Sequence, residues 1–60
     1  MREYTVSKDK NGYFYAHQTG YPNIPVWGSF SKSKRHAMEY AARSMCLTYK
    51  EFMEYRRKRG

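Results

Sequence analysis

The stretch EYTVSKDKNGYFYAHQ, residues 3–18, decides the fold, because two short alternating segments flank an Asn-Gly pair. Alternation of apolar and polar side chains on both sides is typical of β-strands with one buried face. Asn11-Gly12 is a strong hairpin signal, since both central residues of a type I′ turn take positive φ. We therefore predict an antiparallel hairpin with strands at about residues 2–7 and 13–18.

A third strand is expected at about residues 24–30, after the turn-forming cluster at residues 19–23. Pro25 has no N–H to donate, so it places the start of this strand at an edge of the sheet. Together the segments predict a three-stranded antiparallel meander, about the smallest sheet that is stable by itself. We expect Trp27 in the core, because a small domain needs its largest ring inside.

The apolar period changes to that of a helix after Ser31. Ser31 or Ser33 can cap a helix over about residues 33–45. Its expected buried stripe is Ala37, Tyr40, Ala41, Ser44 and Met45.

A second helix is predicted over about residues 49–58. Thr48 and Glu51 form a capping box, and Leu47 and Phe52 have the spacing of a hydrophobic staple. The fold class that results is α+β, a single domain over residues 1–60. Its three-stranded antiparallel sheet packs on one helix and is followed by a short basic C-terminal helix.

The charge of the chain points to a polyanionic partner. Its 60 residues hold 12 Lys and Arg against 5 Asp and Glu, a net charge of +7, and residues 31–60 carry +6 of it. Such concentration favours nucleic acid first, an acidic protein surface second and an anionic membrane third. The basic run at residues 56–59 has an alternative interpretation, a solvated helix end whose cations match the helix dipole.

Reactive groups are scattered along the chain. Cys46, the single cysteine, cannot form an intrachain disulfide, and we expect it to be a small buried filler. His17 and His36 lack a third ligand for a metal, and no glycine loop could hold a phosphate. We therefore expect no enzyme activity and no cofactor. Without an apolar leader or a membrane span, we expect a cytoplasmic protein.

Two groups of residues suggest how DNA would be bound. If the hairpin packs on the helix, Tyr13, Tyr15 and His17 lie on its other face, where aromatic rings can touch a groove. The predicted phosphate contacts are Lys32, Lys34, Arg35, Arg43, Lys50, Arg56, Arg57, Lys58 and Arg59. The helix pair around Cys46 also has the spacing of a helix-turn-helix, which fits any two packed short helices as well.

The runs Tyr13–His17 and Val26–Ser31, followed by Ala37 and Tyr40, resemble the Apetala/ethylene-response-factor DNA-binding domain. That fold, shared with the amino-terminal domains of phage and transposon integrases, has a three-stranded sheet and a helix. The resemblance covers about residues 4–45 and implies that the sheet lies in the major groove, with Tyr15 and His17 contacting DNA.

A looser similarity connects the chain to the HicB-type antitoxin domain, another strand meander followed by a helix. It rests on Tyr4-Thr5-Val6, on Asn11-Gly12-Tyr13 and on Gly28 before the helix. That family binds a protein partner as well as DNA. The resemblance therefore keeps a protein-binding function open.

The function expected from the sequence is a small double-stranded-DNA-binding protein of a phage or mobile element. The alternative is a small phage-encoded inhibitor or adaptor that binds an acidic host protein, since Tyr, Trp and Arg are also enriched at protein interfaces. An exposed edge strand and an aromatic face would also allow a homodimer. We expect no membrane partner.

Overall fold

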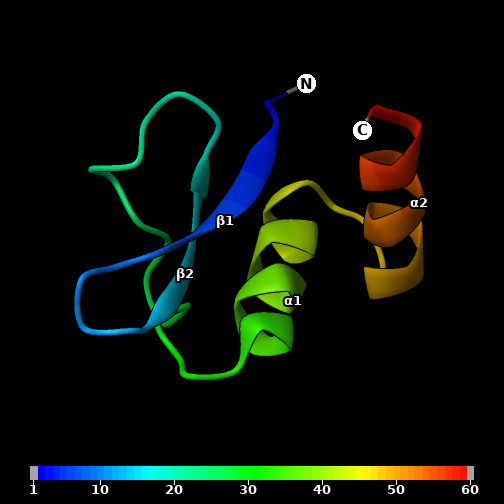
Figure 1. Cartoon of the computed structure of the whole chain (residues 1–60). Coiled ribbons are helices and arrows are strands. Elements are labelled where there is room, and N and C mark those ends of the chain that lie inside the picture. Colours follow the sequence, from blue (N-terminus) through cyan, green and yellow to red (C-terminus); the bar gives the residue numbers. More distant parts are fainter. Residues whose placement is uncertain (1, 60) are drawn as a thin grey trace.

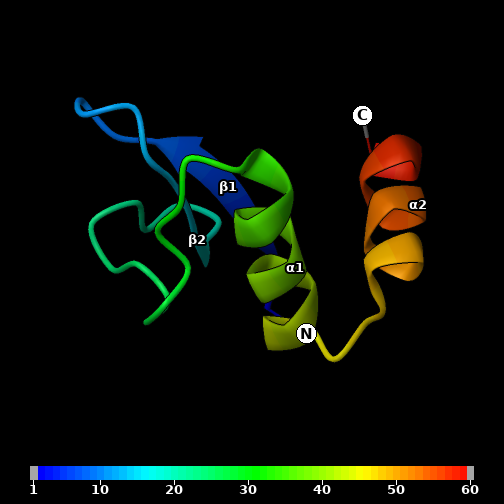
Figure 2. The same ribbon diagram turned by 90° about the horizontal axis from the view of Figure 1, so that it is seen from below.

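The computed structural model describes residues 2–59 and contains two strands and two helices. They follow in the order β1 (Tyr4–Lys8), β2 (Phe14–Gln18), α1 (Lys34–Ser44) and α2 (Tyr49–Arg59). In Figures 1 and 2 the long connection between β2 and α1 lies on one side of the hairpin, and α1 lies between the hairpin and α2. The fold is α+β, with a two-stranded antiparallel sheet.

The hairpin forms where the sequence predicts it, with a different turn. β1 and β2 pair from Tyr4 opposite Gln18 to Lys8 opposite Phe14. Of the turn residues only Gly12 has a positive φ, +87°, so the turn is not of type I′. The Asp9 carboxylate instead accepts the backbone N–H groups of Asn11 and Tyr13, both at 2.9 Å. The Asp9 N–H donates to the Tyr13 carbonyl at 2.8 Å, which leaves a loop of residues 10–12 that ends in the left-handed Gly12. An aspartate that satisfies two turn amides favours such a loop.

The predicted third strand over residues 24–30 is wrong. This segment lies beside β2 but meets it only in two isolated bridges, Phe14 with Ser31 and His17 with Pro25. Between the bridges it has five residues, 26–30, opposite only Tyr15 and Ala16 on β2. The surplus residues must loop out, so a regular third strand cannot form.

A type II turn at Val26–Ser29 accommodates the extra residues of this segment. The Ser29 N–H donates to the Val26 carbonyl at 3.2 Å, and Gly28 has φ +81°, as the third position of such a turn requires. The Ser29 hydroxyl then replaces a strand carbonyl, accepting the Ala16 N–H at 3.0 Å. Trp27 lies at the tip of this turn and is 95% exposed, so the expectation of a core tryptophan is wrong.

The core lies between the hairpin and the two helices. Its buried side chains are Ala16, Ala37, Met38, Ala41, Ala42, Met45 and Phe52. α1 contacts both strands and also α2. Four alanines let the backbones approach closely, and Phe52 of α2 is the largest fully buried side chain. In the predicted stripe of α1, Tyr40 and Ser44 are only half-buried.

The helix ends follow local signals. The predicted capping box is confirmed: the Thr48 N–H donates to Glu51 at 2.9 Å, and the Glu51 N–H donates to the Thr48 hydroxyl at 3.1 Å. α1 ends in a Schellman motif, in which the Leu47 N–H donates to the Ala42 carbonyl at 2.9 Å. Cys46 holds the left-handed position of this motif at φ +59° and is exposed. The expectation that Cys46 is a buried filler is therefore wrong.

Candidate nucleic-acid interface

Carboxylates neutralise few of the cations of this chain. The structure pairs Arg35 with Glu39, with 3.3 Å between the Arg35 Nε and the Glu39 Oε2. The Asp9 carboxylate accepts hydrogen bonds within its own turn, and the Glu51 carboxylate accepts one from the Thr48 N–H. The Glu3 carboxylate accepts a hydrogen bond from the Tyr55 hydroxyl. Most Lys and Arg side chains thus keep their charge available to a partner.

Four lysines gather at one end of the molecule, which we call the lysine end: Lys8, Lys10, Lys32 and Lys34. Lys8 ends β1 and Lys10 lies in the turn that follows, whereas Lys32 precedes the N-cap of α1 and Lys34 is the first residue of this helix. Backbone hydrogen bonds between Phe14 and Ser31, of 2.7 and 2.9 Å, hold the two segments together. All four side chains are exposed. Figure 1 shows the hairpin turn and the start of α1 at the same end of the molecule.

Aromatic rings lie beneath two of these lysines. The Lys8 Nζ is 5.6 Å from the centre of the Phe14 ring, and the Lys32 Nζ is 5.1 Å from the centre of the Tyr13 ring. The rings attract the ammonium groups by a cation–π interaction, while both lysines stay exposed to water. Lysine side chains that are already held over a ring lose less conformational entropy when an anion binds than freely moving lysines do.

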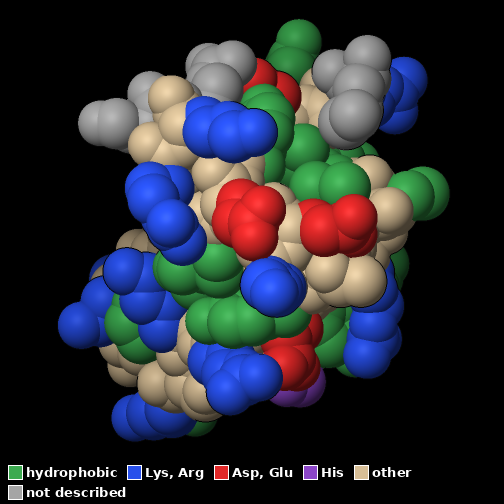
Figure 3. Space-filling model, turned by 90° about the vertical axis from the view of Figure 1, so that its right-hand side faces the viewer, with side chains coloured by type: hydrophobic (Ala, Val, Ile, Leu, Met, Phe, Trp, Pro, Cys, Tyr) green, Lys and Arg blue, Asp and Glu red, His purple; other side chains and the backbone are tan. Residues whose placement is uncertain are grey.

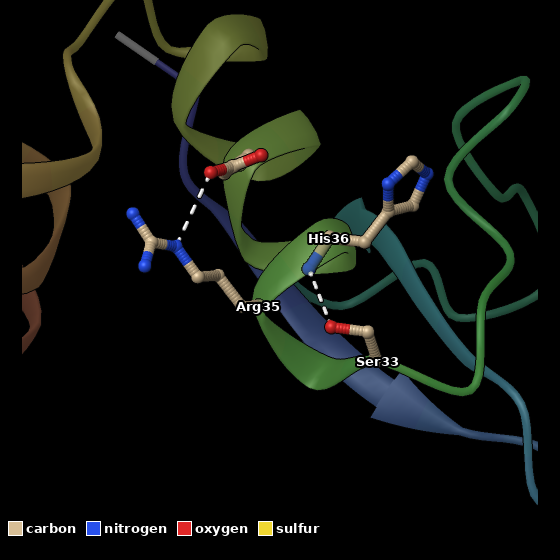
Figure 4. A network of polar contacts seen from close by, with 4 residues as sticks. Ser33, Arg35 and His36 are labelled. Atoms are coloured by element: carbon tan, nitrogen blue, oxygen red, sulfur yellow. Dashed lines mark hydrogen bonds and ion pairs between the residues drawn. The ribbon is translucent and has the colours of Figure 1, made fainter.

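The N-terminus of α1 adds to the positive potential of the lysine end. Ser33 caps the helix by accepting the His36 N–H at 3.4 Å, and Figure 4 shows Arg35 and His36 pointing to opposite sides of the helix. The first turn contains no acidic residue and begins with Lys34, whereas Arg35, the next residue, is paired with Glu39 of the following turn. Cations at the positive end of a helix dipole are unfavourable by themselves and are stabilised when an anion binds there.

The face that carries α2 is mixed in charge. In Figure 3 acidic side chains lie in the middle of this face, among lysines and arginines. Glu51 and Glu54 are both exposed on α2. The predicted phosphate contacts on α2 therefore lie among carboxylates and do not form one surface with the lysine end.

The remaining predicted contacts are placed as follows. Arg43 lies over the Tyr40 ring at 5.1 Å and Arg56 over the Phe52 ring at 5.6 Å. Lys50, Arg57 and Lys58 are exposed on α2, and the side chain of Arg59 is outside the described part of the chain.

The predicted aromatic face of the hairpin is largely covered. His17 is only 4% exposed, so the expectation that it faces solvent is wrong. The connection between β2 and α1 folds over it: the Tyr15 hydroxyl donates to the Pro22 carbonyl at 3.1 Å, and the Tyr15 ring stacks on Phe30 at 5.0 Å. Tyr13 alone stays 40% exposed, beside Lys32 at the lysine end.

The buried His17 has hydrogen-bond partners at both ring nitrogens. Its Nδ1 donates to the Gln18 carbonyl at 2.9 Å, and its Nε2 is 2.6 Å from the Ser7 hydroxyl. A serine beside an oriented imidazole is also the arrangement of an activated nucleophile. Here His17 lies beneath the connection, so the pair satisfies buried polar atoms under this layer. Across residues 2–59, no three His, Cys, Asp or Glu side chains come together as a metal site would require.

Sequence reasoning missed Lys8 and Lys10. The signal was present, because the two lysines flank Asp9 directly before the Asn-Gly pair of the hairpin. The net charge of the first half, only +1, concealed them, since it counted carboxylates that the fold uses internally.

Comparisons with protein families, curated proteins and solved structures found no match to this chain. The resemblances drawn from the sequence stay hypotheses, and the three-stranded sheet that they imply is absent from residues 2–59. No helix in the described range is both long enough and apolar enough to cross a bilayer.

Proposed function

We propose that this chain is a small cytoplasmic DNA-binding protein of a phage or mobile element. It contacts the phosphates of double-stranded DNA with its lysine end. The observation that supports this function best is that the bonded pair Phe14 and Ser31 joins the hairpin end with Lys8 and Lys10 to the segment with Lys32 and Lys34, which begins a helix without an acidic residue in its first turn. Tyr13, partly exposed among them, can contact a sugar or a base edge.

The size of the lysine end sets the expected salt dependence. Four lysines that each neutralise one phosphate give a slope of about −3.6 for log K against log [salt]. Affinity for a duplex should then fall by about two orders of magnitude between roughly 50 and 200 mM salt. These contacts carry no information about base sequence, so the binding is tolerant of sequence.

A titration of a mixed-sequence duplex, followed by fluorescence anisotropy at several salt concentrations, tests this proposal. In one variant Lys8, Lys10, Lys32 and Lys34 are changed to glutamine. In the matched control the exposed Arg43, Lys50, Arg57 and Lys58 are changed to glutamine. Both variants keep a net charge of +3, four less than the chain's +7.

The lysine-end variant should lose most of its affinity and of its salt slope, while the control keeps most of both. Equal losses in both variants would show that only net charge matters. Stronger loss in the control would move the interface to the helices. A wild-type affinity that does not change with salt would contradict DNA binding altogether.

An acidic host protein is the alternative partner, and the same lysine end would bind it. Lysines held over rings, such as Lys32 over Tyr13, suit carboxylates as well as phosphates. A polyglutamate competitor separates the two functions. Displacement of the duplex at equal concentrations of negative charge would favour the acidic protein, whereas retention of the duplex would favour DNA.

A further inference from the structure

The chain contains a long uncharged segment, which runs from the hairpin turn to the start of α1. Residues 11–31 contain no Lys, Arg, Asp or Glu, although the chain as a whole carries 17 such residues. Within this run Ile24 is 67% exposed, Trp27 95% and Phe30 48%. We call Ile24, Pro25, Trp27 and Phe30 the tryptophan patch. Large apolar groups at such exposure, clustered and without charges, are typical of an interaction site.

The backbone holds Trp27 firmly in this exposed position. On one side the Val26 N–H donates to the Ala16 carbonyl at 2.8 Å, and on the other the buried Ser29 is bonded to Ala16. The His36 Nε2 donates to the Gly28 carbonyl at 3.1 Å. A backbone fixed in this way loses little entropy on association and presents the Trp27 side chain at a defined place on the surface.

The patch combines a knob and a hole. Beside Trp27 is a hollow of about 280 Å³, lined by Pro25, Val26, Trp27, Gly28 and Phe30. In a two-fold symmetric dimer the same patch faces itself, so it must be complementary to its own copy. A protruding indole next to an apolar hollow on one patch meets this requirement, because each Trp27 can enter the hollow of the other copy.

The charge pattern favours a second copy of the chain as the partner that binds the tryptophan patch. At +7 per chain, two copies repel each other wherever their cations meet, and residues 11–31 are the longest run free of charge. DNA bound at the tryptophan patch would place phosphates against residues 24–30, which contain no cation to neutralise them. From these observations we infer that the chain forms a two-fold homodimer through the tryptophan patch, with Trp27 of each copy seated in the hollow of the other.

The surface available makes this a weak dimer. A standard interface takes about 800 Å² from each partner, whereas the whole chain exposes 4515 Å². A patch of four side chains lies below that size, so dissociation constants in the micromolar range or above are expected. The dimer should therefore appear as the concentration rises.

Sedimentation equilibrium without DNA, from about 1 μM to 1 mM in moderate salt, tests this inference. The variant Trp27→Lys puts a cation in the patch. Because Trp27 is almost fully exposed, this variant should fold, which circular dichroism checks. The matched control Asn11→Lys has the same net charge, one above +7, but carries it at the exposed hairpin turn.

The wild type and the control should rise from a single-chain mass of 7.3 kDa toward twice that value. Trp27→Lys should raise the dissociation constant at least about 30-fold. The fluorescence of Trp27 should shift to the blue as the wild-type mass rises. A wild type that stays monomeric, a Trp27→Lys variant that dimerises equally well, or a mass that grows beyond the dimer would each overturn the inference.

Discussion

Replacement of Ser29 by alanine tests how the outer layer is attached to the hairpin. The Ser29 hydroxyl accepts the Ala16 N–H at 3.0 Å and donates to the Val26 carbonyl at 2.7 Å. Ser29 and Ala16 are both 0% exposed, so water cannot take over these bonds. A buried amide that loses its acceptor costs about 1–3 kcal/mol. For a chain of this size, 1 kcal/mol lowers the melting temperature by about 8 °C.

We therefore expect Ser29→Ala to melt about 8–24 °C below the wild type, measured by far-ultraviolet circular dichroism. Ser44→Ala is the matched control, because its hydroxyl donates to the Tyr40 carbonyl of its own helix at 3.0 Å. This control should change stability by less than about 0.5 kcal/mol. If Ser29→Ala melts within a degree or two of Ser44→Ala, the Ser29 hydroxyl does not replace a strand carbonyl as the acceptor of the Ala16 N–H, and the reasoning is refuted.

Three further variants test the helical half of the fold. Phe52→Ala should cost about 3–5 kcal/mol, against a total stability of roughly 3–9 kcal/mol for a chain this short, so α2 should lose its helical signal at 222 nm. Cys46→Gly should stabilise the chain by about 1 kcal/mol in urea denaturation, because it relieves a left-handed non-glycine residue. Hydrogen bonds from the backbone N–H and the side chain of Thr48 lower the pKa of Glu51 below its usual 4.5. The stabilisation by Glu51 is thus complete above that value and is lost as the pH falls through the lowered pKa. The difference in α2 helicity between wild type and Glu51→Gln should shrink in acid, and a constant difference would contradict the capping role.

Local signals were sufficient for the helices and insufficient for the third strand. The capping box at Thr48 and Glu51 involves residues three apart, so the sequence contains the whole interaction. The segment 24–30 alternates well enough for a strand, but Gly28 within it was the sign of a turn. What finally excluded the strand was the bond from Ala16 to Ser29, which joins residues far apart in the chain.

The sequence was enough to predict which cations belong to the candidate site, but not how the fold arranges them on the surface. Lys32, Lys34 and Arg35 follow from the basic composition of the second half. The burial of His17 depends on the connection between β2 and α1, which folds back over the sheet. No hydrophobic periodicity in the sequence predicts this arrangement. The lysine end, likewise, exists only because the bridge between Phe14 and Ser31 brings two distant segments together.

A backbone amide titration by nuclear magnetic resonance with a short mixed-sequence duplex, at low salt, tests the central claim most directly. It shows whether this chain binds DNA and which surface does so. The proposal predicts shifts confined to the hairpin turn, residues 8–13, and to the start of α1, residues 31–35, with the shifts fading as salt is added. Shifts concentrated on α2 or on the tryptophan patch, or an unchanged spectrum at low salt, would contradict it.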